Sequence, residues 1–113
     1  MIISQIMGGL GNQLGEYACG YSLSKYLGQE LVLDVSDYIC RGYFRPYCLD
    51  KLQIGNHRKL AYPPVSFRFM EEECIPKELR DCGLRVIELS KVKTREELLA
   101  AAEGAENIYL LGY

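Results

Sequence analysis

The sequence predicts an α/β fold of Rossmann-like βαβ layers around a parallel sheet. Three observations predict it: an apolar run that enters a glycine cluster at residues 8–11, a helical pattern directly after the cluster, and a second apolar run that ends at Asp34. A helix between two buried strands implies that the strands are parallel. The 113 residues, 49% hydrophobic and 25% charged, suit a single domain over residues 1–113.

The N-terminal third of the chain predicts a strand, a helix and a second strand. Residues 2–7 form the first apolar run, and apolar residues then recur at helical spacing from residue 12 to residue 27. Gly28 is placed to end that helix as a left-handed cap, and residues 30–34 follow as the second strand. Ligands of parallel sheets gather at the carboxyl ends of the strands, which is where the glycine cluster lies.

Polar side chains form only a narrow strip along the predicted helix, at Glu16, Ser24 and Lys25. Apolar side chains flank this strip on both sides. We therefore expect a helix that packs deep in the fold and is buried on more than one side.

The middle of the chain, residues 36–75, is rich in Tyr, Pro, Arg and Gly without sustained periodicity. It predicts a long irregular excursion with one short helix near residues 49–52. Thereafter we expect a helix at 76–82, a strand at 84–89, a helix at 94–103 and a strand at 107–111. Thr94 and Glu97 have the spacing of a capping box at the start of the second of these helices.

Composition excludes several classes of function. The formal net charge is −2, with 13 basic and 15 acidic residues in no long block, so we expect no nucleic-acid partner. Because no apolar stretch reaches the length of a membrane span and the N-terminus lacks a signal-peptide pattern, we expect no transmembrane segment. The 5 cysteines are an odd set without metal-like spacing, which favours reduced, buried thiols.

The glycine cluster predicts an anion site. Gly8, Gly9 and Gly11 permit unusual backbone conformations and let a ligand approach the main chain, and Asn12 is placed to cap the helix. The free amides of the first helical turn and the helix dipole favour phosphate. A sugar nucleotide or another pyrophosphate-linked ligand fits such a turn.

Spacing alone leaves three alternatives open at this turn. Residues 9–15 spell GxGxxxG, a relative of the dinucleotide fingerprint, and Asp34 lies at about the distance expected for a ribose contact. A nicotinamide dinucleotide-binding oxidoreductase module, a sugar-nucleotide site and a structural turn without ligand therefore remain possible. No Walker pattern is present, since no Gly-Lys-Ser/Thr follows.

Three segments resemble the bacterial α-1,2-fucosyltransferases, in the right order and across essentially the whole chain. Residues 8–13 read GGLGNQ, like the N-terminal signature of that family, and residues 43–54 are similar to its Arg-Pro-aromatic segment. Residues 108–113 resemble the strand that leads into its Gly-Tyr-Trp motif. The resemblance implies the N-terminal domain of a GT-B glycosyltransferase.

The resemblance also implies an activity and a set of donor-binding residues. Enzymes of this type transfer L-fucose from GDP-fucose to the 2-hydroxyl of a galactoside acceptor, with inversion and without an obligatory metal or cofactor. The glycine loop of the family faces the donor, so Gly8, Gly9, Gly11 and Asn12 are the expected donor-binding residues. For Asn12, a helix cap without a ligand is an equal alternative, and Gln13 is expected only to support the turn.

Residues of the Tyr-rich loop are further candidates for contact with acceptor or donor. Arg45 is suited to hold a sugar hydroxyl or a phosphate, and Tyr43 and Tyr47 to stack on an acceptor sugar. The alternatives are a solvated arginine and tyrosines that merely pack around Pro46. His57, the single histidine, is expected to be a solvent-exposed loop residue, and no carboxylate is assigned as catalytic base.

The sequence departs from the family in two places. Gly15 follows GGLGNQ at a place where the family has bulky residues, and a His-x-Arg-Arg-x-Asp motif has no counterpart before Tyr113. Because that motif belongs to the donor-binding C-terminal domain, we expect this domain to be absent from the chain and the isolated chain to be inactive. A non-catalytic interaction domain from a degraded transferase gene is thus another alternative. We expect self-association through an exposed sheet edge, and a location in the bacterial cytoplasm or at the periphery of the inner membrane.

Overall fold

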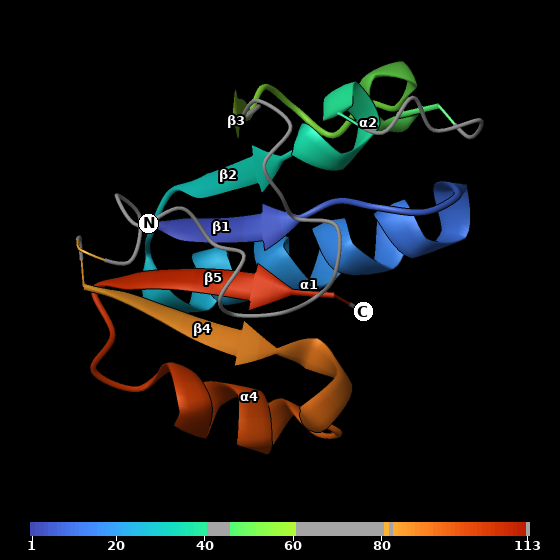
Figure 1. Cartoon of the computed structure of the whole chain (residues 1–113). Coiled ribbons are helices and arrows are strands. Elements are labelled where there is room, and N and C mark those ends of the chain that lie inside the picture. Colours follow the sequence, from blue (N-terminus) through green and yellow to red (C-terminus); the bar gives the residue numbers. More distant parts are fainter. Residues whose placement is uncertain (41–45, 61–80, 82, 113) are drawn as a thin grey trace.

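The structure, a computed structural model, describes residues 1–40, 46–60, 81 and 83–112 and contains a five-stranded parallel sheet (Figure 1). The strands lie in the order β3-β2-β1-β5-β4, and every neighbouring pair is parallel. In chain order the elements are β1 (Ile2–Gln5), α1 (Leu10–Leu27), β2 (Leu31–Asp34), α2 (Ser36–Cys40), η1 (Leu49–Lys51), β3 (Arg58–Leu60), β4 (Leu84–Glu88), η3 (Leu89–Lys91), α4 (Arg95–Ala102) and β5 (Asn107–Leu111). The predicted α/β fold with a parallel, Rossmann-like sheet is confirmed.

The order of the strands reverses at β1. β2 and β3 lie on one side of β1, whereas β5 and β4 lie on the other. Ligands of open parallel sheets bind at the carboxyl ends of the strands beside such a reversal. The glycine turn leaves the carboxyl end of β1, and it therefore lies at the expected binding edge (Figure 1).

Both faces of the sheet are buried, as continuous apolar strands predict. α1 and α4 pack on one face, and the strand residues beneath them include Ile2, Leu31, Leu33, Ile108 and Leu110. The opposite face holds a second buried cluster of Ile3, Val32, Tyr109 and Leu111.

The predicted burial of α1 is wrong. Glu16 and Ser24, from the expected polar strip, are 1% and 5% exposed, whereas the apolar flank exposes Leu14 at 41% and Tyr26 at 61%. The reason is the close approach of the helix to β1. The Ser4 hydroxyl donates to the carbonyl of Glu16 (2.9 Å), so small and hydrogen-bonding residues share the contact face with Leu23.

The ends of the helices follow their sequence signals. Gly28 has φ +65° and its N–H donates to the carbonyl of Ser24, which confirms the left-handed cap. At α4, the Thr94 hydroxyl accepts from the N–H of Glu97 (3.1 Å). The Glu97 carboxylate in turn accepts from the N–H of Lys93 (2.8 Å), one residue before the cap.

The described parts of the predicted excursion at 36–75, residues 36–40 and 46–60, contain three short elements. α2 follows β2 directly, η1 confirms the short helix near residues 49–52, and β3 adds an edge strand beside β2. The sequence missed β3 because a three-residue strand carries no periodic signal. The helix predicted at 76–82 lies mostly outside the described residues.

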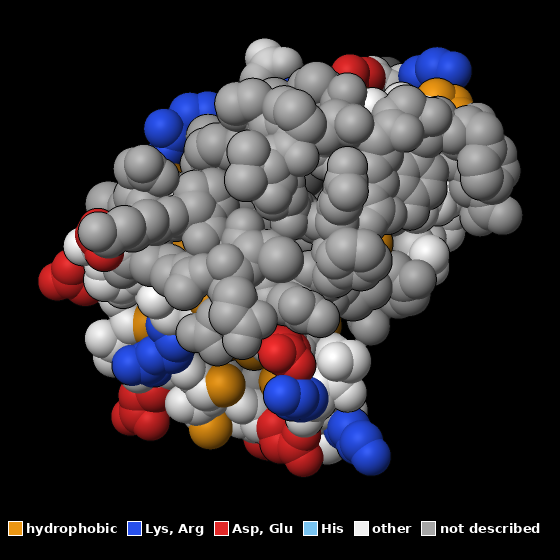
Figure 2. Space-filling view, in the orientation of Figure 1, with side chains coloured by type: hydrophobic (Ala, Val, Ile, Leu, Met, Phe, Trp, Pro, Cys, Tyr) orange, Lys and Arg blue, Asp and Glu red, His pale blue; other side chains and the backbone are white. Residues whose placement is uncertain are grey.

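Charges of both signs are mixed on the described surface over β4 and α4 (Figure 2). Within residues 1–40, 46–60 and 83–112, no helix is long and apolar enough to cross a membrane. β3 and β4 form the two edges of the described sheet. Self-association through such an edge stays a prediction.

Candidate functional site

The glycine turn is a sharp bend between β1 and α1. Gly8 has φ +77°, a conformation that L side chains rarely adopt, and a Cβ built on it would lie 2.7 Å from Nδ2 of Asn12. Gly9 precedes the helix with an extended backbone (φ −82°, ψ 179°). Both φ and space thus require glycine at position 8, whereas the backbone of position 9 suits other residues.

Asn12 is not the helix cap. The helix begins at Leu10, and Asn12 lies within its first turn, half-buried against Gly8. The prediction of an Asn12 cap is therefore wrong, because the bend at Gly8 starts the helix two residues earlier than expected. No side chain of the described residues caps this helix, and its first turn carries no acidic residue.

Gly11 is exposed on the first turn of α1. Among the described residues, no heavy atom outside its two neighbours and the helix backbone lies within 4 Å of a Cβ built at Gly11. Within the described residues, the first turn of α1 thus combines an N-terminus without a side-chain cap, the positive end of the helix dipole and an exposed glycine at its second position. This is the geometry that favours an anionic group at a helix N-terminus.

The buried side chain of Gln13 holds the glycine turn through hydrogen bonds. Its side chain is fully buried, and Nε2 donates to the carbonyls of Gly8 (3.1 Å) and Pro46 (3.0 Å). Its Oε1 accepts from the N–H of Cys48 (2.9 Å). Gln13 therefore supports the turn, as expected, and also binds it to the loop before η1.

Tyr38 of α2 is a second support that the sequence did not reveal. Its hydroxyl donates to the carbonyl of Gly8 (2.6 Å), and its ring lies 5.8 Å from the ring of Tyr47. Gly8 thus receives hydrogen bonds from two elements. The signal was weak because α2 is only five residues long.

Glu16 is the most unusual titratable residue near the turn. Its Oε2 accepts from the N–H of Met7 (2.8 Å), while Oε1 has no partner among the described residues. Burial raises the pKa of Glu16 to about 8, partly offset by the Met7 hydrogen bond and increased further by the charge of Asp37. The sequence placed Glu16 in a polar strip and missed this buried carboxyl.

Asp34 is enclosed at the carboxyl end of β2. It is 1% exposed, Oδ1 accepts from the N–H of Ser36 (3.0 Å) and Oδ2 accepts from the hydroxyl of Tyr109. Burial raises the pKa of Asp34, although these hydrogen bonds act in the opposite direction. Because the Asp34 carboxylate is buried in this way, it is not open to the ribose contact that the dinucleotide alternative needs.

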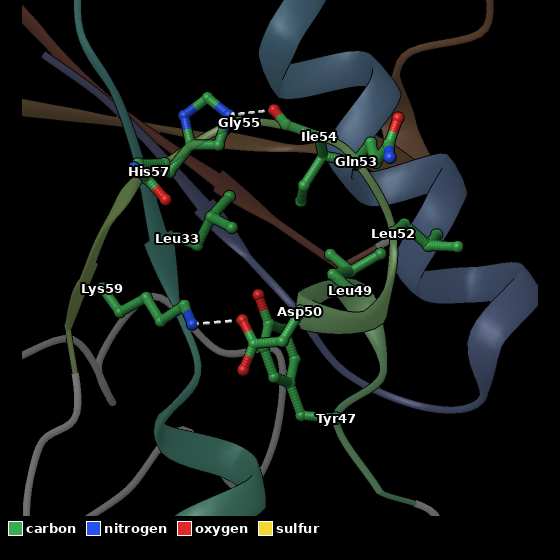
Figure 3. Close-up of a pocket in the computed structure, with 11 residues that line it drawn as sticks. Leu33, Tyr47, Leu49, Asp50, Leu52, Gln53, Ile54, Gly55, His57 and Lys59 are labelled. Carbon is green, nitrogen blue, oxygen red and sulfur yellow. Dashed lines mark hydrogen bonds and ion pairs between the residues drawn. The ribbon is translucent and has the colours of Figure 1, made fainter.

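A cavity of about 300 Å³ lies on the α1 side of β2 and β3, and no residue of the glycine turn lines it (Figure 3). Its polar lining comes from the loop around η1 and from β3, and consists of Tyr47, Asp50, Gln53, Asn56, His57 and Lys59. Tyr47 is the predicted contact residue that the structure places in a cavity. Tyr43 and Arg45 lie outside the described residues.

His57 is not the exposed loop residue that was expected. It is half-buried, and Nε2 lies 3.0 Å from the hydroxyl of Tyr17 and 3.1 Å from the carbonyl of Ile54. Its ring meets that of Tyr17 edge-on. The prediction failed because the loop that carries His57 folds back onto α1.

The described residues contain no group of three or more His, Cys, Asp or Glu side chains that could hold a metal ion. The oxygen and nitrogen groups of the site are instead distributed between the turn and the cavity. Within the described part of the chain, the site is therefore a binding surface of amides, hydroxyls and one ion pair.

Comparison with known proteins gives one distant relative. Over 59 residues the chain is 41% identical to an alpha-1,2-colitosyltransferase of Escherichia coli, a match that covers 50% of this chain and 19% of that enzyme. No protein-family model and no solved structure matches the chain. The match confirms the predicted resemblance as a distant, partial homology and relates the chain to glycosyltransferases.

Proposed function

We propose that this chain supplies the glycine-turn wall of a glycosyltransferase site for a sugar nucleotide. The observation that carries the proposal is the first turn of α1, which is uncapped, free of acidic residues and open around Gly11. In this position, backbone amides and the helix dipole stabilise a negatively charged diphosphate. The partial homology to an alpha-1,2-colitosyltransferase supports the same class of ligand.

In the finer form of the proposal, the donor is GDP-fucose and the acceptor is the 2-hydroxyl of a galactoside. Gly8 shapes the turn, and Gly9 and Gly11 keep the approach free of side chains. Asn12 then faces the donor from the first helical turn. Arg45 and Tyr43 remain proposed contacts for acceptor or donor.

Colitose is a second candidate for the transferred sugar, because the relative is named for it. The two donors differ in the sugar, whereas the glycine turn is proposed to hold the diphosphate that such nucleotide donors share. A nicotinamide dinucleotide is disfavoured, since Asp34 is buried and hydrogen-bonded within the sheet.

The chain by itself is proposed to bind donor weakly and to transfer no sugar. Transfer requires stabilisation of the departing nucleotide diphosphate, to which positioned cationic groups contribute strongly. The chain spans 19% of the matched enzyme, so the activity, acceptor and location of the whole protein are proposals. A bacterial cytoplasmic location is among them.

The test is calorimetric titration of two alanine variants with GDP-fucose. Among the described residues, a Cβ at Gly11 or at Gly15 has no heavy atom within 4 Å apart from its chain neighbours and the helix backbone, so Gly11→Ala and Gly15→Ala are matched changes one helical turn apart. We expect Gly11→Ala to weaken binding about tenfold and Gly15→Ala to leave it unchanged. Equal affinities of both variants, or tighter binding of NAD than of GDP-fucose, would contradict the proposal.

A further inference from the structure

The cavity beside Tyr47 offers a binding site that is separate from the open first turn of α1. β2 contributes Leu33, β3 contributes Lys59, and the chain around η1 contributes the other lining residues of this partly open cavity (Figure 3). At about 300 Å³ it lies at the small end of ligand cavities, which run from roughly 300 to 1,000 Å³. Its size suits one ring better than a nucleotide.

We propose that this cavity binds a single neutral sugar ring of the acceptor, held by the Tyr47 hydroxyl and by the Asp50–Lys59 pair. The proposal rests on the proposed function for the identity of the ligand as an acceptor. The binding of a neutral sugar by itself requires only the cavity.

The charges that line the cavity favour a neutral ligand. The ammonium of Lys59 forms an ion pair with the carboxylate of Asp50, so the two formal charges cancel. A phosphate or carboxylate entering the cavity would meet Asp50 and compete with it for Lys59. A sugar hydroxyl can instead accept from Lys59 and donate to Asp50 without breaking charge balance.

The hydroxyl of Tyr47 is the polar atom that most clearly lacks a partner. It is buried and has no hydrogen-bond partner among the described residues. In Figure 3 the side chain of Tyr47 extends from the loop toward Lys59 and Leu33, which also line the cavity. Burial raises the pKa of Tyr47 to about 12, and the group remains a donor at neutral pH.

The ring faces of Tyr47 are already engaged. Lys59 lies over the ring, with Nζ 5.0 Å from its centre, and Tyr38 packs against it at 5.8 Å. The predicted contact of Tyr47 with a sugar is therefore better made by its hydroxyl than by stacking.

Apolar side chains complete the lining. Leu33, Leu49 and Ile54 line the cavity between its polar groups. Sugar rings carry hydroxyls at their edges and C–H groups on their faces, so a cavity with both kinds of lining suits them. A purely polar ion or a purely apolar ligand would leave one part of the lining unmatched.

The cavity is joined to the glycine turn by two side chains. Gln13 binds the carbonyls of Gly8 and Pro46, and Tyr38 contacts both Gly8 and the ring of Tyr47. A ring bound at Tyr47 would thus sit next to the wall that the proposed donor approaches. This is the arrangement that transfer between two bound sugars requires.

The experiment is saturation-transfer NMR on the full chain with methyl β-galactoside, in the absence of any nucleotide. Galacturonate and galactosamine serve as anionic and cationic comparators of the same size. We expect binding of the neutral galactoside and at least threefold weaker binding of both charged sugars. No saturation transfer to the galactoside, or preference for a charged sugar, would overturn the proposal.

Two matched pairs of variants test the assigned residues. Tyr47→Phe is compared with Tyr26→Phe, since Tyr26 is 61% exposed on α1, and Lys59→Gln with Arg58→Gln, since Arg58 instead pairs with Glu30 (3.3 Å). Tyr47→Phe and Lys59→Gln should each weaken galactoside binding about threefold to tenfold, and the two controls should not. Equal effects within the pairs would overturn the assignment.

The two proposals can fail separately. If GDP-fucose binds and is sensitive to Gly11→Ala while methyl β-galactoside does not bind, the cavity proposal is wrong and the glycine-turn proposal stands. If the galactoside binds through Tyr47 while GDP-fucose does not bind, the sugar site stands and its role as an acceptor site is wrong. The amide spectrum of each variant verifies that it is folded.

Discussion

The carboxylate of Glu16 accepts a hydrogen bond from the backbone N–H of Met7 at 2.8 Å, so the second turn of α1 holds the residue that enters the glycine turn. The contact is buried, and Glu16 is 1% exposed. A carboxyl with a pKa of about 8 is largely protonated at neutral pH. The turn therefore rests on a group whose charge depends on pH.

The first prediction concerns the stability of the fold between pH 4.5 and 8. The folded pKa of Glu16 is raised from 4.5 to about 8, so in this window the native state binds more protons than the unfolded state. The free energy of unfolding should therefore fall as pH rises from 4.5 to 8. Glu16→Gln should flatten this profile and be more stable than the parent at pH 8, as measured by urea unfolding.

Glu30→Gln is the control for that experiment. Glu30 is exposed, with a side-chain exposure of 56%, and pairs with Arg58 at the surface. Its pH profile should follow that of the parent. Parallel profiles for Glu16→Gln and the parent would show that Glu16 does not carry the pH dependence.

The second prediction compares how much the side chains of Gln13 and Asn12 contribute to the stability of the fold. Gln13→Ala removes three hydrogen bonds from a fully buried side chain and should cost about 2–4 kcal/mol in unfolding free energy. Asn12→Ala should cost less than about 0.5 kcal/mol, because Asn12 does not cap the helix. Urea unfolding of both variants measures the difference. A loss of about 1 kcal/mol or more for Asn12→Ala would restore the capping role.

The third prediction concerns the contact between Gly8 and Asn12. Gly8→Ala should lower the unfolding free energy by about 1–3 kcal/mol, because it combines φ +77° with a clash at Asn12. In the double variant Gly8→Ala/Asn12→Ala, the clash with the Asn12 side chain is relieved, whereas the strain of the positive φ at position 8 remains. The double-mutant cycle should therefore show a favourable coupling that recovers part of the loss. Strict additivity would mean that the Asn12 side chain simply moves aside.

The fourth prediction compares two glycines of α1. A Cβ at Gly20 would lie 2.9 Å from Cδ1 of Leu31 and 3.0 Å from Cβ of Ser4, whereas a Cβ at Gly15 would have no such neighbour within 4 Å among the described residues. Gly20→Ala should therefore destabilise the fold by about 1–3 kcal/mol. Gly15→Ala should stabilise it by about 0.5–1 kcal/mol through helix propensity. The unfolding temperature of each variant measures the effect. A shift of both temperatures in the same direction would contradict the close packing of α1 on β1.

The sequence was sufficient to predict elements with a strong local signal. The left-handed cap at Gly28 and the cap at Thr94 depend on residues adjacent in the chain, and both are confirmed. The order of β1, α1 and β2, and of β4, α4 and β5, follows for the same reason, whereas α2 and β3 were not predicted. The glycine turn was recognisable because three glycines lie within four residues.

Features that depend on distant contacts were not predictable. Glu16 is buried because Ser4, Gly20 and the N–H of Met7 bring α1 against β1, which no helical pattern reveals. His57 is half-buried because its loop returns to Tyr17, 40 residues earlier in the chain. The sequence thus revealed the glycine turn but not the side chains that support it.

The measurement that tests the central claim most directly is an amide chemical-shift map of the chain titrated with GDP-fucose. If the uncapped first turn of α1 holds the diphosphate, the largest shifts fall on the backbone amides of Leu10, Gly11 and Asn12, and NAD does not reproduce them. Largest shifts away from the glycine turn, or no shifts at saturating GDP-fucose, would contradict the account.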